Sequence, residues 1–279
     1  MALTIYRSLL WVLFCLSLKA TASELRSDEL VVPSNLAQGG LVIATVAPGY
    51  SVKYKGEPLK INEKGMFILG LGRDADELMR LVVANDKGHQ TDYTFPVAKR
   101  KYNIQSIEGV PQRTVTPNLE DVARIRQDSL LVKNARQGVS DRQDFLAGFK
   151  KPLEGPVTGV YGSQRVYNGT PKNPHYGVDY AAPKGTIVRA PAAGVVQLAH
   201  SDLFYSGGTV IMDHGFGLNS SFLHLSAVLV AEGQEVKQGD PIGKVGATGR
   251  ATGPHLDWRM NWLNVRIDPQ LVMESLPAE

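Results

Sequence analysis

Short apolar runs separated by turn residues dominate the chain from residue 23 to residue 100. Apolar and often β-branched residues gather at 41–46, 51–54, 66–69, 78–84 and 93–97. Runs of this length, bounded by glycine, proline and lysine, are typical of β-strands. Several such strands within about 70 residues predict an immunoglobulin-like β-sandwich over residues 23–100. The region holds no cluster of catalytic residue types, which favours a spacer or docking module.

The pattern changes between residues 101 and 151, where polar residues dominate. Apolar residues recur there about every 3.6 positions, which predicts a helix over 118–137 with Gly138 as its C-cap. Ser140 and Gln143 match a capping box, which predicts a second, short helix. We therefore expect residues 101–151 to be a linker with one or two helices.

Short β-branched runs return after residue 152, now among frequent glycine and proline residues. They lie at 187–189, 194–198, 209–212, 221–223, 242–245 and 256–260. This pattern predicts an antiparallel β-sheet with long loops over residues 152–279, so the chain as a whole is expected to be mainly all-β. Five of the six histidines lie in this region, and we expect the chemistry of the protein there.

Residues 1–22 have the pattern of a secretory signal peptide. Arg7 precedes an apolar segment at 8–18, and Ala20-Thr21-Ala22 supplies small residues at the cleavage position. The apolar segment is too short to span a bilayer as a helix, although a short membrane anchor is the alternative interpretation. We expect an exported protein of the periplasm or cell envelope, with no membrane segment after cleavage.

Charge and cysteine content narrow the possible functions. The chain has 30 basic and 27 acidic residues, and removal of Arg7 and Lys19 with the signal peptide leaves 28 basic against 27 acidic residues. This near-neutral balance gives no support to a nucleic-acid partner. Cys15 is the one cysteine, so the mature chain can form neither a disulfide nor a thiolate metal site.

Three separated segments carry histidine and aspartate in patterns suited to metal-assisted hydrolysis. His175 and Asp179 form an H-x-x-x-D pair, and His224 follows in the sequence F-L-H-L-S. His255 and Asp257 are two residues apart in G-P-H-L-D. If this last segment is a strand, both of its side chains lie on the same face of the sheet.

These residue types can build a catalytic metal site. Imidazole and carboxylate are suitable zinc ligands, and a catalytic zinc site has three protein ligands and an open position for water. Two further polar groups can then transfer protons and stabilise an oxyanion. Gly177 allows the first segment to turn so that its histidine and aspartate converge. A lone H-x-x-x-D pair is more often structural, whereas the three segments together are more specific.

The three segments resemble the signature of the lysostaphin-like (LytM-type) zinc metallopeptidases, which is H-x-x-x-D, an aromatic-x-H-L-S strand, and G-P-H-L-H. The resemblance covers residues 153–270. It implies a barrel-like antiparallel β-sheet peptidase domain that binds one zinc ion per chain and cuts peptidoglycan. Carried over by position, the resemblance makes His175 and Asp179 metal ligands, and it makes His224 and His255 catalytic residues.

The chain departs from this family pattern at the third ligand, where Asp257 replaces a histidine. Aspartate also coordinates zinc, so we predict that Asp257 is the third ligand. Two carboxylates would cancel the charge of a zinc ion and weaken its Lewis acidity. The resulting hypothesis is a more alkaline pH optimum than in relatives, or tolerance of a harder metal such as manganese.

Other polar residues near the three segments have two interpretations each. Arg165, Tyr167 and Asn168 precede the first segment and are candidates for the wall of a substrate groove. Arg250 precedes the third segment, and it either meets a substrate carboxylate or lies in a solvated loop. His214 follows an aspartate at an expected turn, where a structural role is favoured.

The leading prediction is a metal-dependent endopeptidase that hydrolyses peptide cross-links of bacterial peptidoglycan. One alternative is a weak or inactive relative that binds and activates other cell-wall hydrolases, which the change at Asp257 keeps open. Another alternative is a secreted peptidase that acts on proteins. Peptidoglycan stem peptides are the expected partner, and cell-division proteins or other wall hydrolases are further candidates.

Overall fold

The computed structural model describes residues 24–278, so the predicted signal peptide lies outside the described residues. Within this range the chain is mainly β, with three helices, and this confirms the expected fold class. No helix in the described range is long and apolar enough to cross a membrane.

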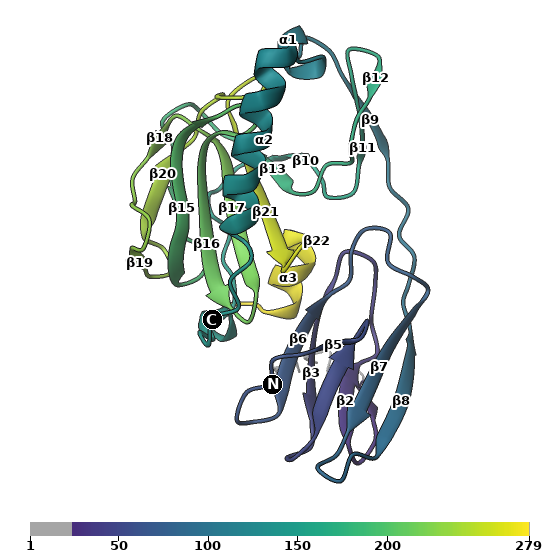
Figure 1. The fold of residues 1–279 in the computed structure, drawn as a ribbon. Coiled ribbons are helices and arrows are strands. Elements are labelled where there is room, and N and C mark those ends of the chain that lie inside the picture. The colour runs from purple at the N-terminus through teal and green to yellow at the C-terminus, as the bar shows by residue number, and fades with distance from the viewer. Residues whose placement is uncertain (1–23, 279) are drawn as a thin grey trace, which may run out of the picture.

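The N-terminal region consists of two four-stranded antiparallel sheets (Figure 1). The first sheet has the order β1-β2-β3-β6, with β1 Glu24–Arg26, β2 Leu30–Pro33, β3 Leu41–Val46 and β6 Met66–Gly70. The second has the order β5-β4-β7-β8, with β4 Ser51–Tyr54, β5 Glu57–Pro58, β7 Leu78–Ala84 and β8 Gln90–Pro96. Alternate residues of β7 are buried in the core, as the period of a half-buried strand requires. All five predicted strands are present, and their immunoglobulin-like type stays a prediction.

The N-terminal sheets pack against one end of the C-terminal sheet. A Cβ atom added to Gly70 would lie 3.0 Å from side-chain atoms of Trp262 and Ile267, so the two regions are in close contact there. Arg100 forms an ion pair with the buried Asp268 at 2.9 Å across the same boundary. The apolar core is continuous through both regions.

The segment between the two regions contains more structure than a linker. It begins with β9 (Ile104–Ile107), which pairs in parallel with β11 (Gln164–Tyr167), and β11 pairs with β12 (Thr170–Pro171). The short helix α1 (Gln112–Val115) follows. A strand of the expected linker is therefore part of a three-stranded sheet with residues of the C-terminal region (Figure 1).

Helix α2 (Leu119–Asn134) confirms the predicted helix but ends earlier than expected. Asn118 caps its N-terminus by accepting a hydrogen bond from the backbone N–H of Asp121 at 2.8 Å. The prediction of Gly138 as the C-cap is wrong, because Ala135 occupies that position.

The prediction of a second, short α-helix from the capping box at Ser140 and Gln143 is also wrong. Residues 140–149 contain only the 3₁₀ turn η1 (Asp144–Ala147). The side chain of Gln143 makes no capping bond, because it accepts a hydrogen bond from Asn62 of the N-terminal region at 2.7 Å. The backbone oxygen of Ser140 likewise accepts from the N–H of Phe216. Tertiary contacts thus replace the local capping pattern.

The C-terminal region is built on one antiparallel sheet of eight strands. Its order is β10-β13-β21-β17-β16-β15-β19, and β22 pairs with β21. The strands are β10 Val157–Gly159, β13 Val178–Ala181, β15 Gly194–Leu203, β16 Gly207–Gly215, β17 Leu218–Leu225, β19 Glu235–Val236, β21 His255–Trp262 and β22 Val265–Ile267. A small sheet of β14 Ile187–Arg189, β20 Pro241–Lys244 and β18 Ala227–Val228 lies beside it, and α3 Pro269–Ser275 ends the described chain.

The two faces of the large sheet have different roles. Val178, Trp258 and Phe222 lie opposite one another on β13, β21 and β17, and all three are fully buried in the apolar core. Their neighbours Asp179 and Asp257 therefore point to the other face.

Helix α2 covers part of this second face (Figure 1). Val132 and Ala135, at its C-terminal end, pack against Leu198, Leu203 and Ile211 of β15 and β16. The helix thus shields the β15–β16 side, while the face over β13 and β21 lies outside this packing and carries the polar residues described next.

Candidate metal centre

Two carboxylates lie directly opposite each other on neighbouring strands. Asp179 of β13 pairs with Asp257 of β21 in the antiparallel register, and both side chains are almost completely buried. Like charges in directly opposed positions destabilise a sheet unless cations compensate them. The register therefore places two buried negative charges side by side, and nearby positive groups are needed to compensate them.

His175 completes a group of three possible ligands. It lies in the loop before β13, where its backbone N–H donates to Ser163 at 2.8 Å and its carbonyl accepts from Gly162 at 2.7 Å. One ligand atom each from His175, Asp179 and Asp257 lie within 4.8 Å of one another.

The donor atoms of this group fit a metal ion. His175 Nε2 and Asp179 Oδ1 are buried 3.1 Å apart, and apart from this mutual contact neither atom has a hydrogen-bond partner among the described residues. Buried polar atoms without a partner are rare because their desolvation is not compensated. A cation held between them would compensate both atoms, and imidazole with carboxylate is a common ligand set for zinc.

Gly177 is required for a different reason from the turn expected from the sequence. It is not among the glycines with positive φ. A Cβ atom at this position would lie 2.5 Å from Asp257 Oδ1 and 2.6 Å from the carbonyl oxygen of Trp258. The absence of a side chain therefore lets β13 and β21 approach closely enough for their carboxylates to converge.

Two arginines compensate the carboxylates in the structure. Arg259 lies two residues after Asp257 on β21, and its Nε donates to both carboxylate oxygens at 3.0 Å. Arg165 of β11 donates to Asp179 Oδ2 at 2.7 Å. Each carboxylate thus has its own guanidinium partner.

The two carboxylates are ionised as a result of these partners. Burial raises the pKa of Asp257, but Arg259, together with His175 and His224, outweighs this effect and holds the pKa well below its ordinary value. Burial also raises the pKa of Asp179, and His175 together with Arg165 lowers it to below the ordinary value. Both groups therefore have the charge state that a metal ligand needs.

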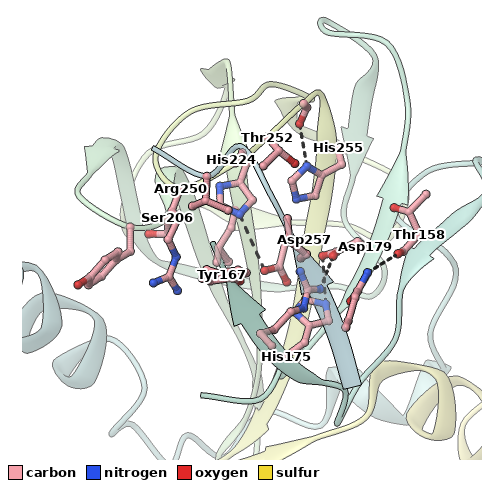
Figure 2. Close-up of a pocket in the computed structure, with 18 of the residues that line it drawn as sticks. Thr158, Tyr167, His175, Asp179, Ser206, His224, Arg250, Thr252, His255 and Asp257 are labelled. Atoms are coloured by element: carbon pink, nitrogen blue, oxygen red, sulfur yellow. Dashed lines mark hydrogen bonds and ion pairs between the residues drawn. The ribbon is translucent and has the colours of Figure 1, made fainter. Parts of the chain in front are cut away.

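Two further histidines lie on the opposite side of the carboxylates from His175 (Figure 2). His224, at the end of β17, and His255, at the start of β21, have ring centroids 4.8 Å apart. His224 Nδ1 lies 2.8 Å from the carbonyl oxygen of Thr248, and His255 Nδ1 lies 2.8 Å from that of Gly253. Each Nδ1 therefore carries the proton and donates it, which leaves the Nε2 lone pair free.

His224 is neutral at physiological pH. Burial is the main cause, and it lowers the pKa of His224 to about 4, although the charge of Asp257 opposes the effect. The backbone of His224 has a φ of +64°, which is unusual for a residue other than glycine. Such strained positions persist where the surrounding structure holds a side chain in one direction.

These groups share one groove of about 510 Å³. Its floor is formed by residues of β13, β17 and β21, and Figure 2 shows the labelled side chains converging on it. Residues of β9 and of the segment after it also line the groove, as does the loop before β21. No residue of the described range 24–100 lines this groove, so the N-terminal sheets leave it open.

The structure brings all five predicted site residues together in this groove. They are His175, Asp179, His224, His255 and Asp257.

Of the four residues considered as candidates for the groove wall or for substrate binding, three line the groove. Arg165, Tyr167 and Arg250 also line the groove, but Asn168 does not, because its side chain bonds to the backbone of Val110. His214 is buried in β16 rather than at a turn. Its Nδ1 lies 2.7 Å from the carbonyl oxygen of Ala193, which is consistent with the structural role.

Arg259 and Tyr205 were not recognised from the sequence. Arg259 could have been found, since it lies two positions after Asp257 and therefore on the same face of the strand. Tyr205 lies in the turn between β15 and β16 and has no local signal that connects it with the groove.

Comparisons with known proteins find similar peptidases. Residues 173–269 match the model of peptidase family M23. The DD-carboxypeptidase/endopeptidase Mpg of Neisseria meningitidis is 43% identical over 104 residues, which are 37% of this chain and 23% of that protein. The peptidoglycan DD-endopeptidase ShyA of Vibrio cholerae is 44% identical over 87 residues, which are 31% of this chain and 20% of that protein. The matches thus span about a quarter or less of these two relatives.

A solved structure matches much more of the chain. The crystal structure of a putative peptidase M23 from Pseudomonas aeruginosa has 31% sequence identity and a TM-score of 0.66. The match covers 85% of this chain and 94% of the Pseudomonas chain. These findings confirm the resemblance drawn from the three sequence segments, and the chain belongs to peptidase family M23.

Proposed function

We propose that this protein is a zinc-dependent endopeptidase that hydrolyses peptide cross-links of bacterial peptidoglycan. The observation that carries the proposal is the convergence of three ligand-type atoms within 4.8 Å of one another. Next to them lie two histidines whose ring centroids are 4.8 Å apart. The names of the relatives support the substrate, since they describe DD-endopeptidases of peptidoglycan. We therefore expect the enzyme to cleave the peptide bond of a D-alanyl cross-link.

His175, Asp179 and Asp257 would hold one zinc ion in this proposal. When bound, zinc supplies Lewis-acid polarisation of the scissile carbonyl and activation of water. His175 Nε2 and Asp179 Oδ1 contact only each other among the described residues, which argues against an inactive regulator, because a binding module gains nothing from burying two ligand-type atoms with so few partners.

His224 and His255 would transfer protons. Both have Nδ1 fixed on a backbone carbonyl, so each can accept a proton at Nε2. A neutral His224 is available as a base at physiological pH because its pKa is about 4. Once protonated, either imidazole can return the proton to the leaving amine or donate a hydrogen bond to the developing oxyanion.

The arginines change the electrostatic expectation for this site. Asp179 and Asp257 bring two negative charges, and Arg165 and Arg259 bring two positive charges. These four groups sum to zero, so the charge of the metal ion is not cancelled as the ligand set alone suggested. This charge balance removes the cause of an alkaline shift, and we expect a pH optimum like that of relatives with two histidine ligands.

The proposed location is the periplasm or cell envelope. It is supported by the pattern of residues 1–22 and by relatives that are named for action on peptidoglycan. Peptidoglycan stem peptides would be the main partner, and contacts with cell-division proteins or other wall hydrolases belong to the same proposal.

Metal analysis combined with wall digestion tests the function. Purified protein should contain about one zinc per chain by mass spectrometry, and it should release peptide fragments from isolated peptidoglycan until a chelator is added. A His175→Ala variant should lose both zinc and activity. A His224→Ala variant should keep zinc and lose activity roughly 10²- to 10⁴-fold.

Two results would contradict the proposal. Protein that binds no metal and releases no fragments would restore the regulator alternative. Protein that cleaves polypeptides and leaves peptidoglycan intact would favour a peptidase with a protein substrate. Arg126→Gln is a suitable control variant, because Arg126 is exposed on α2 and does not line the groove.

A further inference from the structure

Arg250 has a fixed position in the wall of the groove. It lies in the loop between β20 and β21, and its backbone N–H donates to the carbonyl oxygen of Tyr205 at 2.9 Å. Its guanidinium carbon lies 4.9 Å from the ring centroid of Tyr167 and 4.6 Å from that of Tyr205. Two aromatic rings thus hold the cation in place through cation–π contacts.

The guanidinium of Arg250 differs from the other two guanidiniums of the groove. Arg165 and Arg259 are each paired with a carboxylate, as described above. Arg250 forms no ion pair and no side-chain hydrogen bond with any residue in the described range. Its contacts with the two tyrosine rings use no oxygen acceptor, so its five N–H donors remain available.

The surroundings of Arg250 make an external partner favourable. Burial is the main cause that lowers the pKa of its guanidinium below the ordinary value, so the charge is partly removed from water. Arg165 and Arg259 add further positive charge to its environment. A partly buried cation without a protein partner is stabilised when a ligand supplies the anion.

Arg250 is also connected to both proposed catalytic histidines. Thr248, two residues before it, holds Nδ1 of His224, and Gly253, three residues after it, holds Nδ1 of His255. Figure 2 places Arg250 on the same side of the carboxylates as His224. A group bound by Arg250 would therefore lie near the bond that these histidines act on.

We propose that Arg250 binds a carboxylate of the peptide substrate and so selects peptides with a free carboxylate near the scissile bond. This inference rests on the proposed function and defines its substrate more closely. A planar guanidinium matches a carboxylate through two parallel hydrogen bonds, which an ammonium cannot reproduce. The carboxylate can come from a side chain of the peptide or from its free C-terminus, since peptidoglycan stem peptides offer both.

Three matched peptides test the inference on the full chain loaded with zinc. One cross-linked stem peptide carries free carboxylates, the second has its side-chain carboxylates amidated, and the third has its C-termini amidated. Loss of a charge-assisted hydrogen bond predicts that kcat/KM falls roughly 10- to 100-fold for the peptide that lacks the recognised carboxylate. The peptide that shows this fall identifies the source of the carboxylate.

Variants assign the preference to Arg250. The Arg250→Gln variant should cleave all three peptides with the same low kcat/KM, equal to that of the wild type for the peptide that lacks the recognised carboxylate. The Arg250→Lys variant should keep only part of the preference. The control Arg126→Gln should keep all of it. The zinc content and thermal midpoint of Arg250→Gln should match those of the wild type, and Arg250→Lys decides the question if the glutamine variant does not fold.

The inference is overturned if the wild type cleaves the free and amidated peptides equally, or if Arg250→Gln retains the preference. A wild-type protein that cleaves none of the three peptides contradicts the proposed function instead. Titration calorimetry with the same peptides then still tests Arg250. The wild type should bind the free peptide roughly 10-fold more tightly than the amidated one, and equal affinities would overturn the inference.

Discussion

The Asp257–Arg259 pair offers a direct test of how this chain tolerates an aspartate at the third ligand position. The side chain of Asp257 is only 3% exposed, and Arg259 is the guanidinium that contacts it. Replacing Arg259 by Met keeps an unbranched apolar stem of similar length and removes the charge. In the metal-free protein, Asp257 would then be a buried carboxylate directly opposite another carboxylate, that of Asp179.

The expected loss of stability is large. Removal of one partner from a buried ion pair destabilises a protein by roughly 3–5 kcal/mol, because the remaining charge stays buried without compensation. For a domain of this size each 1 kcal/mol lowers the thermal midpoint by about 2–4 °C. The Arg259→Met variant without metal should therefore melt roughly 6–20 °C below the wild type.

The same substitution should increase the affinity of the protein for zinc. Arg259 and a metal ion both carry positive charge to Asp257, so the arginine opposes the metal by electrostatic repulsion. Without Arg259, zinc affinity should rise roughly tenfold, which is about 1.4 kcal/mol. The stabilisation by added zinc should increase by the same amount.

Tryptophan fluorescence during urea unfolding measures both effects. Trp258 and Trp262 lie in β21, and protein produced without residues 1–22 has no other tryptophan, so the signal reports on the strand that carries the site. Unfolding is recorded with chelator and with zinc for the wild type, for Arg259→Met and for the control Arg126→Met. If Arg259→Met unfolds like the wild type in chelator and gains no extra stabilisation from zinc, the compensating role of Arg259 is refuted.

Three further predictions concern the same sheet. Burial holds the pKa of His214 in the folded protein below its ordinary value of 6.5. As the pH drops, the unfolded chain therefore binds a proton at His214 before the folded protein does, and the free energy of unfolding should fall below about pH 6.5. Urea midpoints at pH 7.5 and 5.5 should show this fall, and His214→Gln should reduce it. Trp258→Ala removes a fully buried side chain and should lower the free energy of unfolding by roughly 3–5 kcal/mol, measured by circular dichroism. Gly177→Ala places a methyl group 2.5 Å from Asp257 Oδ1, so zinc affinity measured by titration should fall at least roughly tenfold, and unchanged affinity would contradict the close approach.

Local periodicity was sufficient to predict one part of the site. Alternation along β21 correctly placed His255 and Asp257 on one face, because this strand is regular over its whole length. The same alternation applies to Arg259, whose charge changes the electrostatic interpretation of the site. The position of Arg259 on the same face as Asp257 is therefore predictable from the sequence.

Other features depend on contacts that no local pattern encodes. The alignment of Asp179 with Asp257 is a matter of strand register between segments far apart in the chain. The parallel pairing of β9 with β11 is equally non-local, and the short polar β9 has no run of apolar residues to reveal it. The false capping box at Ser140 and Gln143 shows the reverse case, in which a good local match lost to a hydrogen bond with Asn62.

The pairing of β9 with β11 limits how this protein can be divided for experiments. A fragment that starts near residue 152, where the composition changes, would contain every proposed ligand and both catalytic histidines. It would lack Gln105, Ile107 and Val110, which line the groove, and it would expose the edge of β11 that β9 covers. An unpaired strand edge favours self-association. An excised peptidase unit therefore has to begin before Ile104 if it is to keep its substrate wall and remain monodisperse.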